Sequence, residues 1–408
     1  MKVLFVAPRL PWPADTGGKI RTLNILKQLA KRSQVHLVSF SFGNKDQEWI
    51  SEFSKIGVGV TLVAMAEANI VQKILGVLIN PIPYSMSKYY SPDMEKILTT
   101  LNQQERWDAI HMDHLHMAHY RWCFGDVPCF LDEHNVEYRI LERCAEVEKN
   151  FIKKFLFSQQ AGKMKKFENE KINEFVSYFA VSEDDRNILQ KFITDKTTGH
   201  VIPNGVDTDF FQSGDHLKPN AERRFNEDSL IFTGSMDWLP NDDAVIFFCE
   251  KILPLIWKQK NNVKFYVVGK NPSSQIQDWA RRDSRIVVTG RVADVRPLMA
   301  QSQIFVVPIR AGGGTRLKIL EAMSMQKAVV STTVGAEGIT YTDGQNILLA
   351  DTPEKFTQQV LFLLNDSQKA KDIGQAGRTL VREKYDWNTI GQKLYKIYEE
   401  IGNVRQTH

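Results

Sequence analysis

Three consecutive glycines stand between a strand-like segment and a helix-like segment in the last third of the sequence. Gly312, Gly313 and Gly314 follow the apolar run 304–308, and a helical pattern begins soon after them. Glycines let the backbone approach a ligand closely, and the free N–H groups of a helix start attract an anion. The segment predicts a phosphate-binding turn, and it also fits an ordinary flexible turn before a surface helix.

Polar side chains follow these glycines directly. Thr315, Arg316 and Lys318 come next, and Glu321 lies in the apolar part of the same predicted helix. Cations in the first turn of a helix oppose its dipole by a few tenths to about 1 kcal/mol each, so two of them indicate a bound polyanion. A buried carboxylate needs hydrogen-bond donors, which a ribose diol would supply. These residues favour a ligand that carries a diphosphate and a sugar.

Imidazoles and carboxylates gather near two strand ends in the first half of the chain. The histidines are His111, His114, His116, His119 and His134, and Asp113 and Glu137 stand among them. Their spacing is irregular and no cysteine accompanies them, so a zinc site is a poor match and we expect no metal. The acidic residues from 132 to 137 also fit the cap of the following helix.

Short β-branched runs alternate with helical patterns along the whole chain, which is typical of parallel α/β sheets. The predicted strands are 2–7, 34–40, 58–64, 108–112, 127–131, 177–181 and 200–203, then 229–234, 263–269, 285–289, 304–308, 327–332 and 347–349. They form two doubly wound, Rossmann-like sheets, and a chain of 408 residues is long enough for two cores. We expect the two sheets to face each other across a cleft, with ligands beyond the carboxyl ends of the strands.

Composition excludes several classes of function. The formal net charge is only +4, from 52 basic and 48 acidic residues, so nucleic acid is not the expected partner. No apolar stretch is long enough to span a membrane, and prolines interrupt the first apolar run before a signal sequence forms. The four cysteines form no regular framework, which favours a reducing compartment. We expect a cytoplasmic protein.

The glycine segment resembles the nucleotide-sugar motif of retaining GT-B glycosyltransferases of family 4, the glycosyl transferases group 1. In that family two glutamates are separated by seven residues before Ala-Met, and Glu321 matches the second, which binds ribose. The first would fall at Gly313, so its contact to the sugar is not carried over. The resemblance implies that the turn residues Gly312, Gly313, Gly314 and Thr315 bind the donor together with Arg316, Lys318 and Glu321.

Further segments carry the same resemblance. The turn 203–207 resembles the family's interdomain hallmark, and 331–339 also matches the family. Gly234 stands where many relatives carry Gly-Arg and Lys-Gly, and these cations are absent, which makes Arg316 and Lys318 the expected phosphate ligands. Arg291 lies in a loop that contacts the base in relatives, and a solvent-exposed arginine is the alternative. Gly234 and Arg291 are therefore predicted donor-binding residues.

In the first half, Gly17, Gly18 and Arg21 resemble the family's Gly-Gly-x-x-Arg loop. The resemblance implies that Gly18 helps to close the donor site and that Arg21 binds acceptor or phosphate. Many relatives have His-x-His at residues 111–113, where this chain has Asp113 in the second position. We predict Asp113 and His134 as catalytic residues, and we predict that His116 and Glu137, with Arg21, bind the acceptor.

The resemblance implies a retaining, metal-independent hexosyltransferase without a cofactor. Its donor is a nucleotide-diphosphate sugar, with UDP favoured over GDP or dTDP, and its acceptor is a glycan, a lipid-linked molecule or a small molecule of bacterial surface-glycan or secondary-metabolite synthesis. The implied domains are 1–205 for the acceptor, 206–380 for the nucleotide sugar, and a helix in 381–408 that crosses back. Two alternatives stay open: an inactive GT-B protein that binds a nucleotide sugar or a partner transferase, and a GT-B epimerase or phosphorylase.

Residues 149–171 combine lysines with apolar residues at helical spacing. A basic amphipathic helix of this kind can rest on anionic lipid, and such a helix more often packs on its own sheet. Peripheral contact with the inner face of the membrane is therefore a further expectation, while the oligomeric state is not predicted.

Overall fold

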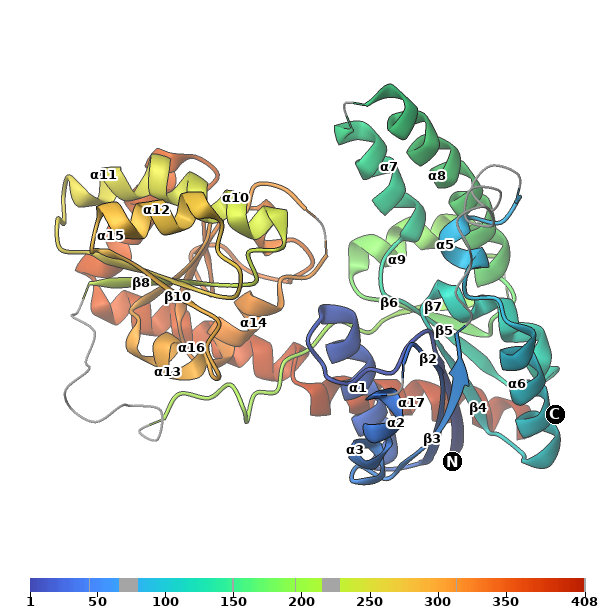
Figure 1. Ribbon diagram of the computed structural model, residues 1–408. Helices are drawn as coiled ribbons and strands as arrows, with labels where there is room; N and C mark the ends of the chain where they lie inside the picture. The colour runs from blue at the N-terminus through green and yellow to red at the C-terminus, as the bar shows by residue number, and fades with distance from the viewer. Residues whose placement is uncertain are drawn as a thin grey trace. The chain divides into compact units, whose positions relative to one another are not determined.

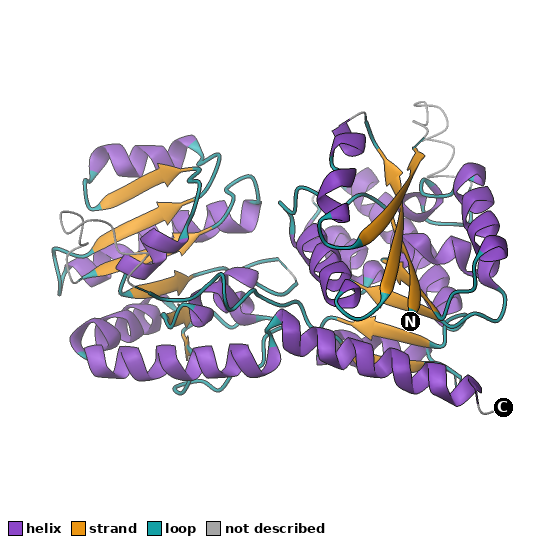
Figure 2. Cartoon of the chain, turned by 90° about the horizontal axis from the view of Figure 1, so that it is seen from below, coloured by secondary structure: helices purple, strands orange, loops and turns teal. Residues whose placement is uncertain are grey.

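The computed structural model describes residues 1–43, 45–65, 80–148, 150–194, 196–214, 228–312 and 314–406. The chain forms two compact units (Figure 1). Unit 1 comprises Met1–Pro203 and Ile390–His408, and unit 2 comprises Asn204–Thr389. Each unit contains one parallel sheet with helices on both faces (Figure 2). The predicted fold class, two doubly wound parallel sheets, is confirmed.

The sheet of unit 1 has the strand order β3-β2-β1-β4-β5-β6-β7. Its strands are β1 (Lys2–Ala7), β2 (Gln34–Ser41), β3 (Val58–Ala64), β4 (Ala109–Asp113), β5 (Cys129–Glu133), β6 (Ser177–Ala180) and β7 (Thr198–Val201). Its described helical segments are α1 (Gly17–Ala30), α2 (Lys45–Glu48), α3 (Ile50–Ser54), α5 (Tyr84–Ser87), α6 (Pro92–Gln104), η1 (Leu115–Phe124), α7 (Glu137–Val147), α8 (Phe151–Ile172), α9 (Glu183–Leu189) and η2 (Gln190–Phe192).

The sheet of unit 2 has the strand order β10-β9-β8-β11-β12-β13. Its strands are β8 (Ser229–Thr233), β9 (Lys264–Val268), β10 (Ile286–Gly290), β11 (Ile304–Val307), β12 (Ala328–Ser331) and β13 (Leu348–Leu349). Its described helical segments are α10 (Leu239–Phe247), η5 (Phe248–Ile252), α11 (Leu253–Trp257), α12 (Ser274–Arg282), α13 (Arg296–Gln301), α14 (Leu317–Ser324), η6 (Val334–Ala336), α15 (Pro353–Asn365) and α16 (Ser367–Lys384).

The central strands are buried on both faces because helices cover each side of the sheet. Residues 3–7 of β1 and 304–307 of β11 have no exposed surface, and all are apolar. Continuous apolar runs of this kind are what a covered parallel strand requires, and they made the strands recognisable in the sequence.

Within the described residues, no helix combines the length and the apolar character needed to cross a membrane.

The last helix, α17 (Trp387–Gln406), packs on unit 1 from Ile390 onward. Its Tyr398 is buried, hydrogen-bonds to His111 of β4, and has its ring centroid 4.3 Å from that of Phe130. Gly391 lies against α1, where an added Cβ would come within 2.6 Å of the Cβ of Gln28. Only glycine allows this close approach without a shift of the two helices.

The chain order reverses between β1 and β4 in unit 1, and between β8 and β11 in unit 2. In open parallel sheets this reversal opens a crevice beyond the carboxyl ends of the two strands, and ligands bind there. In unit 1 the two strands end at Ala7 and Asp113, and in unit 2 they end at Thr233 and Val307. The loops that follow these four residues therefore hold the candidate sites.

Candidate functional site

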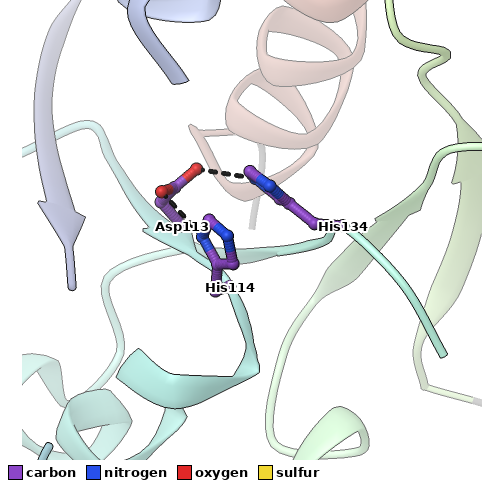
Figure 3. A group of neighbouring side chains, drawn as sticks. All are labelled: Asp113, His114 and His134. Carbon is purple, nitrogen blue, oxygen red and sulfur yellow. Dashed lines mark hydrogen bonds and ion pairs between the residues drawn. The ribbon is translucent and has the colours of Figure 1, made fainter. Parts of the chain in front are cut away.

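Asp113 is the centre of the polar group at the reversal point of unit 1. It ends β4, its side chain is 1% exposed, and both carboxylate oxygens accept hydrogen bonds. His114 Nδ1 lies 2.9 Å from Oδ2 and His134 Nε2 lies 2.9 Å from Oδ1 (Figure 3). The hydroxyl of Thr22 on α1 donates to Oδ2 at 2.9 Å. Burial opposes ionisation, but the two imidazoles outweigh it and hold the pKa of Asp113 well below its ordinary value.

His134 follows β5 and stands between two carboxylates. Its Nε2 is 2.9 Å from Asp113 and 3.3 Å from Oδ2 of Asp132. Burial lowers the pKa of this imidazole, but the two carboxylates raise it more strongly, to about 9. His134 is therefore a buried imidazolium at neutral pH, and together with a second cation its charge balances the two carboxylates beside it.

Arg21 on α1 completes this charge network. Its guanidinium donates to both oxygens of Asp132, at 2.9 Å from Nε and 2.6 Å from Nη2, and also to the carbonyl of Pro203 at 3.1 Å. Arg21 is 1% exposed and Asp132 is fully buried. The Arg21 charge helps to hold the pKa of Asp132 below its ordinary value, against the opposing effect of burial. Arg21 thus fixes Asp132 and, through it, His134.

His114 presents its imidazole at the protein surface. Its side chain is 20% exposed, and its backbone combines a φ of 69° with a ψ of 149°, which residues other than glycine seldom adopt. Residues held in such strained conformations concentrate at functional sites. Burial and the nearby His134 charge lower the pKa of His114, while Asp113 opposes this effect. With Nδ1 bonded to Asp113, the neutral ring leaves Nε2 as a hydrogen-bonding atom.

A pocket of about 230 Å³ opens beside this imidazole. Gly18 forms part of its wall, and a Cβ added there would lie 3.6 Å from His114 Nε2 and 3.7 Å from His134 Nδ1. The ring of His116 packs edge-on against Tyr89, with centroids 4.9 Å apart. The residues that line the pocket are Pro8, Arg9, Pro11, Thr16, Gly18, Lys19, Thr22, Tyr89, Asp113, His114 and His116. The lining combines apolar and aromatic residues with a few hydrogen-bonding groups, as small-molecule sites do.

Not every predicted residue of unit 1 reaches this pocket. Asp113, Gly18 and His116 line it, and His134 lies directly behind Asp113. Arg21 does not line it, because its guanidinium is buried against Asp132. Glu137 opens α7, where its backbone N–H donates to Oε1 of Glu168 at 2.8 Å, and burial raises the pKa of its carboxyl to about 7.

Three ligand atoms of Asp113, His114 and His134 lie within 4.8 Å of one another, as do those of His111, Asp113 and Asp132. Two imidazoles and a carboxylate can bind a transition metal. In the first group, however, the side chains hydrogen-bond to one another and the raised pKa of His134 favours a proton on that ring. In the second group Asp132 is already paired with Arg21. The geometry is that of a hydrogen-bonded charge network.

The charge of His134 makes a testable contribution to stability. Its pKa is about 9 in the folded chain and about 6.5 when unfolded, so its contribution is fully present below pH 6.5 and is lost as pH rises through 9. We expect His134→Gln, which keeps a neutral donor, to lower the free energy of unfolding by about 3 kcal/mol at pH 6.5 and by much less at pH 9.5. Urea unfolding of both proteins across this range measures the difference, and a pH-independent difference would contradict the assignment.

In unit 2 the glycine turn follows β11 as predicted. Gly312 has a φ of 104° and Gly314 a φ of 83°, both in the region that favours glycine, while Gly313 lies outside the described residues. Arg316 stands at the N-cap of α14 and is 8% exposed. A Cβ added at Gly312 would lie 3.1 Å from Arg316 Nη2, so the guanidinium lies against the turn. Thr315, between them, is partly buried.

Lys318 links this turn to the end of β8. Its Nζ donates to Oδ1 of Asn241 at 2.8 Å and lies 4.0 Å from the ring centroid of Phe232. A Cβ added at Gly234 would lie only 2.7 Å from Nζ, so Gly234 leaves the space that the ammonium occupies. Burial lowers the pKa of Lys318 to about 7 and raises that of Glu321, one turn further along α14, to about 7. A bound polyanion would favour the charged form of the lysine.

The predicted donor-binding residues of unit 2 therefore fall into two places. Lys318 lies against Gly234, Arg316 lies against Gly312, and both cations stand at the start of α14, on which Glu321 follows. Arg291 is exposed beyond the end of β10, two strands away from β8. Across the described part of the chain, no hydrogen bond or ion pair joins Arg291 to the turn or to α14.

His114 and Thr22 are among the residues of the candidate sites that were not predicted from the sequence. In the sequence His114 is one of several histidines, and no motif includes Thr22 as a ligand. Both have a recognisable signal: His114 is the first residue after a strand that ends at the reversal point, and Thr22 lies one turn beyond Gly18 on the facing helix. Thr22 Oγ1 also lies 3.0 Å from the carbonyl oxygen of Gly18, so its one hydroxyl proton is shared between Gly18 and Asp113.

Two protein-family models match the chain. The model described as "Glycosyltransferase Family 4" matches residues 16–210, and the one described as "Glycosyl transferases group 1" matches residues 227–366. Together they cover both units. The loop with Gly18, the network around Asp113 and the glycine turn with Glu321 all lie inside the matched segments.

Curated relatives resemble parts of the chain. An uncharacterised 44.6 kDa protein in the cps region of Klebsiella pneumoniae is 23% identical over 41% of this chain and 45% of its own length. A GDP-mannose-dependent monoacylated alpha-(1-6)-phosphatidylinositol monomannoside mannosyltransferase of Corynebacterium glutamicum is 23% identical over 48% of this chain and 55% of its own length. The chain thus spans about half the length of the curated relatives it matches.

Solved structures share the fold over the full length. Sucrose-phosphate synthase from Thermosynechococcus elongatus has a TM-score of 0.72 at 13% identity, covering 99% of this chain and 100% of that one. HepE of Anabaena in complex with UDP has a TM-score of 0.67 at 15% identity, covering 98% and 100%. The family resemblance expected from the sequence is therefore confirmed: the chain belongs to glycosyltransferase family 4, the group 1 glycosyl transferases, and has their GT-B fold.

Proposed function

We propose that this chain is a retaining glycosyltransferase that moves a sugar from a nucleotide-diphosphate sugar onto a hydroxyl of an acceptor. The observation that carries the proposal is the group of Arg316, Lys318 and Glu321 beside the positive-φ glycine turn of unit 2. It combines cations for a diphosphate with a half-buried carboxylate for a ribose, in a chain of family 4. Membership of the family supports the reaction class.

We assign donor binding to residues 206–380. Arg316, Lys318 and the backbone of the glycine turn hold the diphosphate, because both cations lie at the turn and their charges balance the leaving group. Glu321 accepts the hydrogen bonds of the ribose diol, and Arg291 is kept as a candidate for the base. HepE binds UDP and the Corynebacterium relative depends on GDP-mannose, which supports a UDP- or GDP-hexose as donor.

We assign acceptor binding to residues 1–205, with the helix in 381–408 as its support. The pocket beside His114 is large enough for a hydroxylated molecule, and Nε2 of His114 is placed to accept a hydrogen bond from the acceptor hydroxyl. His116 lines the same pocket and is the second acceptor candidate. We propose a positioning role for Arg21, because its guanidinium holds Asp132. Glu137 opens α7 outside the pocket, and we propose that it contacts only a part of the acceptor that extends beyond the pocket.

Asp113 and His134 complete the proposed mechanism. In a retaining reaction the leaving diphosphate can take the acceptor proton on the same face of the sugar, so no protein nucleophile is required. The ionised Asp113 orients His114 and stabilises positive charge that develops at the transferred sugar. The imidazolium of His134 keeps Asp113 ionised although it is buried. No step in this scheme uses a metal.

His114→Asn separates positioning of the acceptor from folding. The backbone of His114, at φ 69° and ψ 149°, strains asparagine no more than histidine, and the asparagine amide still donates to Asp113, but the atom that faces the pocket is lost. We expect kcat to fall about a hundredfold and donor affinity to stay unchanged. Steady-state release of nucleoside diphosphate measures kcat, and donor titration measures affinity. His36→Asn, at a half-buried histidine of β2 outside the pocket, is the matched control.

The anomeric configuration of the product tests the reaction type. We expect NMR of the transferred sugar to show the same configuration as in the donor, in a reaction carried out with EDTA. An inverted product would refute the retaining mechanism. The pathway proposed is bacterial surface-glycan or secondary-metabolite synthesis, which the cps-region relative and the mannosyltransferase relative support for a glycan or lipid-linked acceptor.

A further inference from the structure

The first turn of α8 exposes three large apolar side chains. Phe151 is 81% exposed, Ile152 64% and Phe155 62%. The turn is well formed, because the side chain of Asn150 accepts the backbone N–H groups of Ile152 and Lys153 at 3.0 and 3.1 Å. We call residues 150–155 the α8 tip. Contiguous exposed apolar side chains of this size usually mark an interaction surface.

The rest of α8 is held by unit 1, so the tip is not simply a loose helix. Ala161, Met164, Phe167 and Ile172 are buried. Lys163 Nζ donates to the carbonyl of Asn80 at 2.7 Å, which ties the middle of the helix to the segment before α5. Figure 1 shows α7 and α8 as a hairpin that rises from the sheet of unit 1, with the start of α8 at its far end.

Positive charge surrounds the exposed apolar residues. Lys153 and Lys154 are exposed in the same turn, and in the described part of the chain neither forms a hydrogen bond or ion pair through its ammonium. Of the nearby acids, Glu142 pairs with Arg139 at 2.7 Å and Glu148 accepts the backbone N–H of Asn150 at 2.8 Å. Residues 139–171 contain nine lysines and arginines but five glutamates, in a chain whose charges otherwise balance.

We infer that the α8 tip docks on an anionic lipid surface. Phe151, Ile152 and Phe155 would enter the headgroup region, while Lys153 and Lys154 extend their ammonium groups to lipid phosphates. Two copies of this tip would bring like charges together, which disfavours a second chain as the occupant. The inference goes beyond the proposed function and does not depend on it. It makes unit 1 the part of the chain that approaches a membrane.

Vesicle co-sedimentation tests this inference with the full chain. We expect the wild type to sediment with phosphatidylglycerol vesicles in low salt, much less with phosphatidylcholine vesicles, and less as salt rises. K153Q/K154Q should weaken partitioning into phosphatidylglycerol vesicles about thirtyfold, because each lysine near an anionic surface contributes about fivefold. F151S/I152S/F155S should weaken it by about a hundredfold or more, since three apolar side chains no longer enter the interface.

Matched variants of unit 2 serve as controls. K355Q/K371Q removes the same charge from two exposed lysines of α15 and α16, and should sediment like the wild type. The tip variants replace exposed residues, so their thermal unfolding should match that of the wild type. The inference is overturned if the wild type does not bind phosphatidylglycerol vesicles, if the apolar triple variant binds equally well, or if sedimentation velocity shows a dimer that this variant abolishes.

Discussion

Replacement of Asp113 by asparagine is expected to lower the rate of sugar transfer about a thousandfold with little change in donor affinity. The carboxylate accepts hydrogen bonds from Thr22, His114 and His134, and an amide can accept only on its oxygen. Loss of its charge also removes one of the two carboxylates that raise the pKa of His134. The orientation of His114 and the negative charge in the pocket lining are lost together.

The measurement for Asp113→Asn is acceptor-dependent release of nucleoside diphosphate, with donor affinity determined by titration of the same preparation. Asp93→Asn, at an exposed aspartate of α6 in the same unit, should behave like the wild type. If folded Asp113→Asn retains transfer within tenfold of the wild type, Asp113 is not at the reacting centre.

Glu321→Ala is expected to raise the dissociation constant of the donor about a hundredfold, because hydrogen bonds to a charged group contribute about 1.5 to 3 kcal/mol. The effect should be large because burial desolvates this carboxyl, which raises the pKa of Glu321 to about 7. Glu321→Gln keeps one acceptor oxygen and should lose less. Transfer at donor concentrations near the wild-type dissociation constant should fall in proportion.

Isothermal titration calorimetry with the nucleoside diphosphate and with the nucleoside, which has no phosphate, distinguishes ribose binding from phosphate binding. Glu321→Ala should weaken both ligands, whereas Lys318→Met should weaken only the diphosphate. Glu354→Ala, at an exposed glutamate of α15, is the control in the same unit. If Glu321→Ala binds the nucleoside as tightly as the wild type does, Glu321 does not bind the ribose.

Much of the fold could be read from the sequence because covered parallel strands leave continuous apolar runs. β1 lies at the predicted residues 2–7, and the positive-φ glycines stand after β11 where a phosphate turn was expected. Strand bounds were less exact at β5, which was predicted at 127–131 but includes Asp132 and Glu133. Acidic residues at that position fit a helix cap equally well by local rules.

The charge network of unit 1 could not be predicted, because it depends on contacts between distant parts of the chain. Asp132 lies inside a buried strand because Arg21, 111 residues earlier, and His134 supply its counter-charges. Because the sequence does not show this ion pair, Arg21 was expected to bind a ligand. In the structure its guanidinium is buried against Asp132. The exposed tip of α8 is similar: lysines and phenylalanines at helical spacing fit a packed helix until burial is known.

Titration of the purified chain with UDP-, GDP-, dTDP- and ADP-sugars in EDTA tests the central claim most directly, with thermal shift for binding and release of nucleoside diphosphate for turnover. We predict that at least one of these donors raises the melting temperature of the chain. An extract that contains the acceptor should then stimulate release of nucleoside diphosphate, and Glu321→Ala should lose both responses. If a donor binds but no acceptor stimulates release of nucleoside diphosphate, the proposed transferase activity is contradicted and a nucleotide-sugar-binding protein is favoured. Absence of binding to every donor would contradict the assignment of Arg316, Lys318 and Glu321 itself.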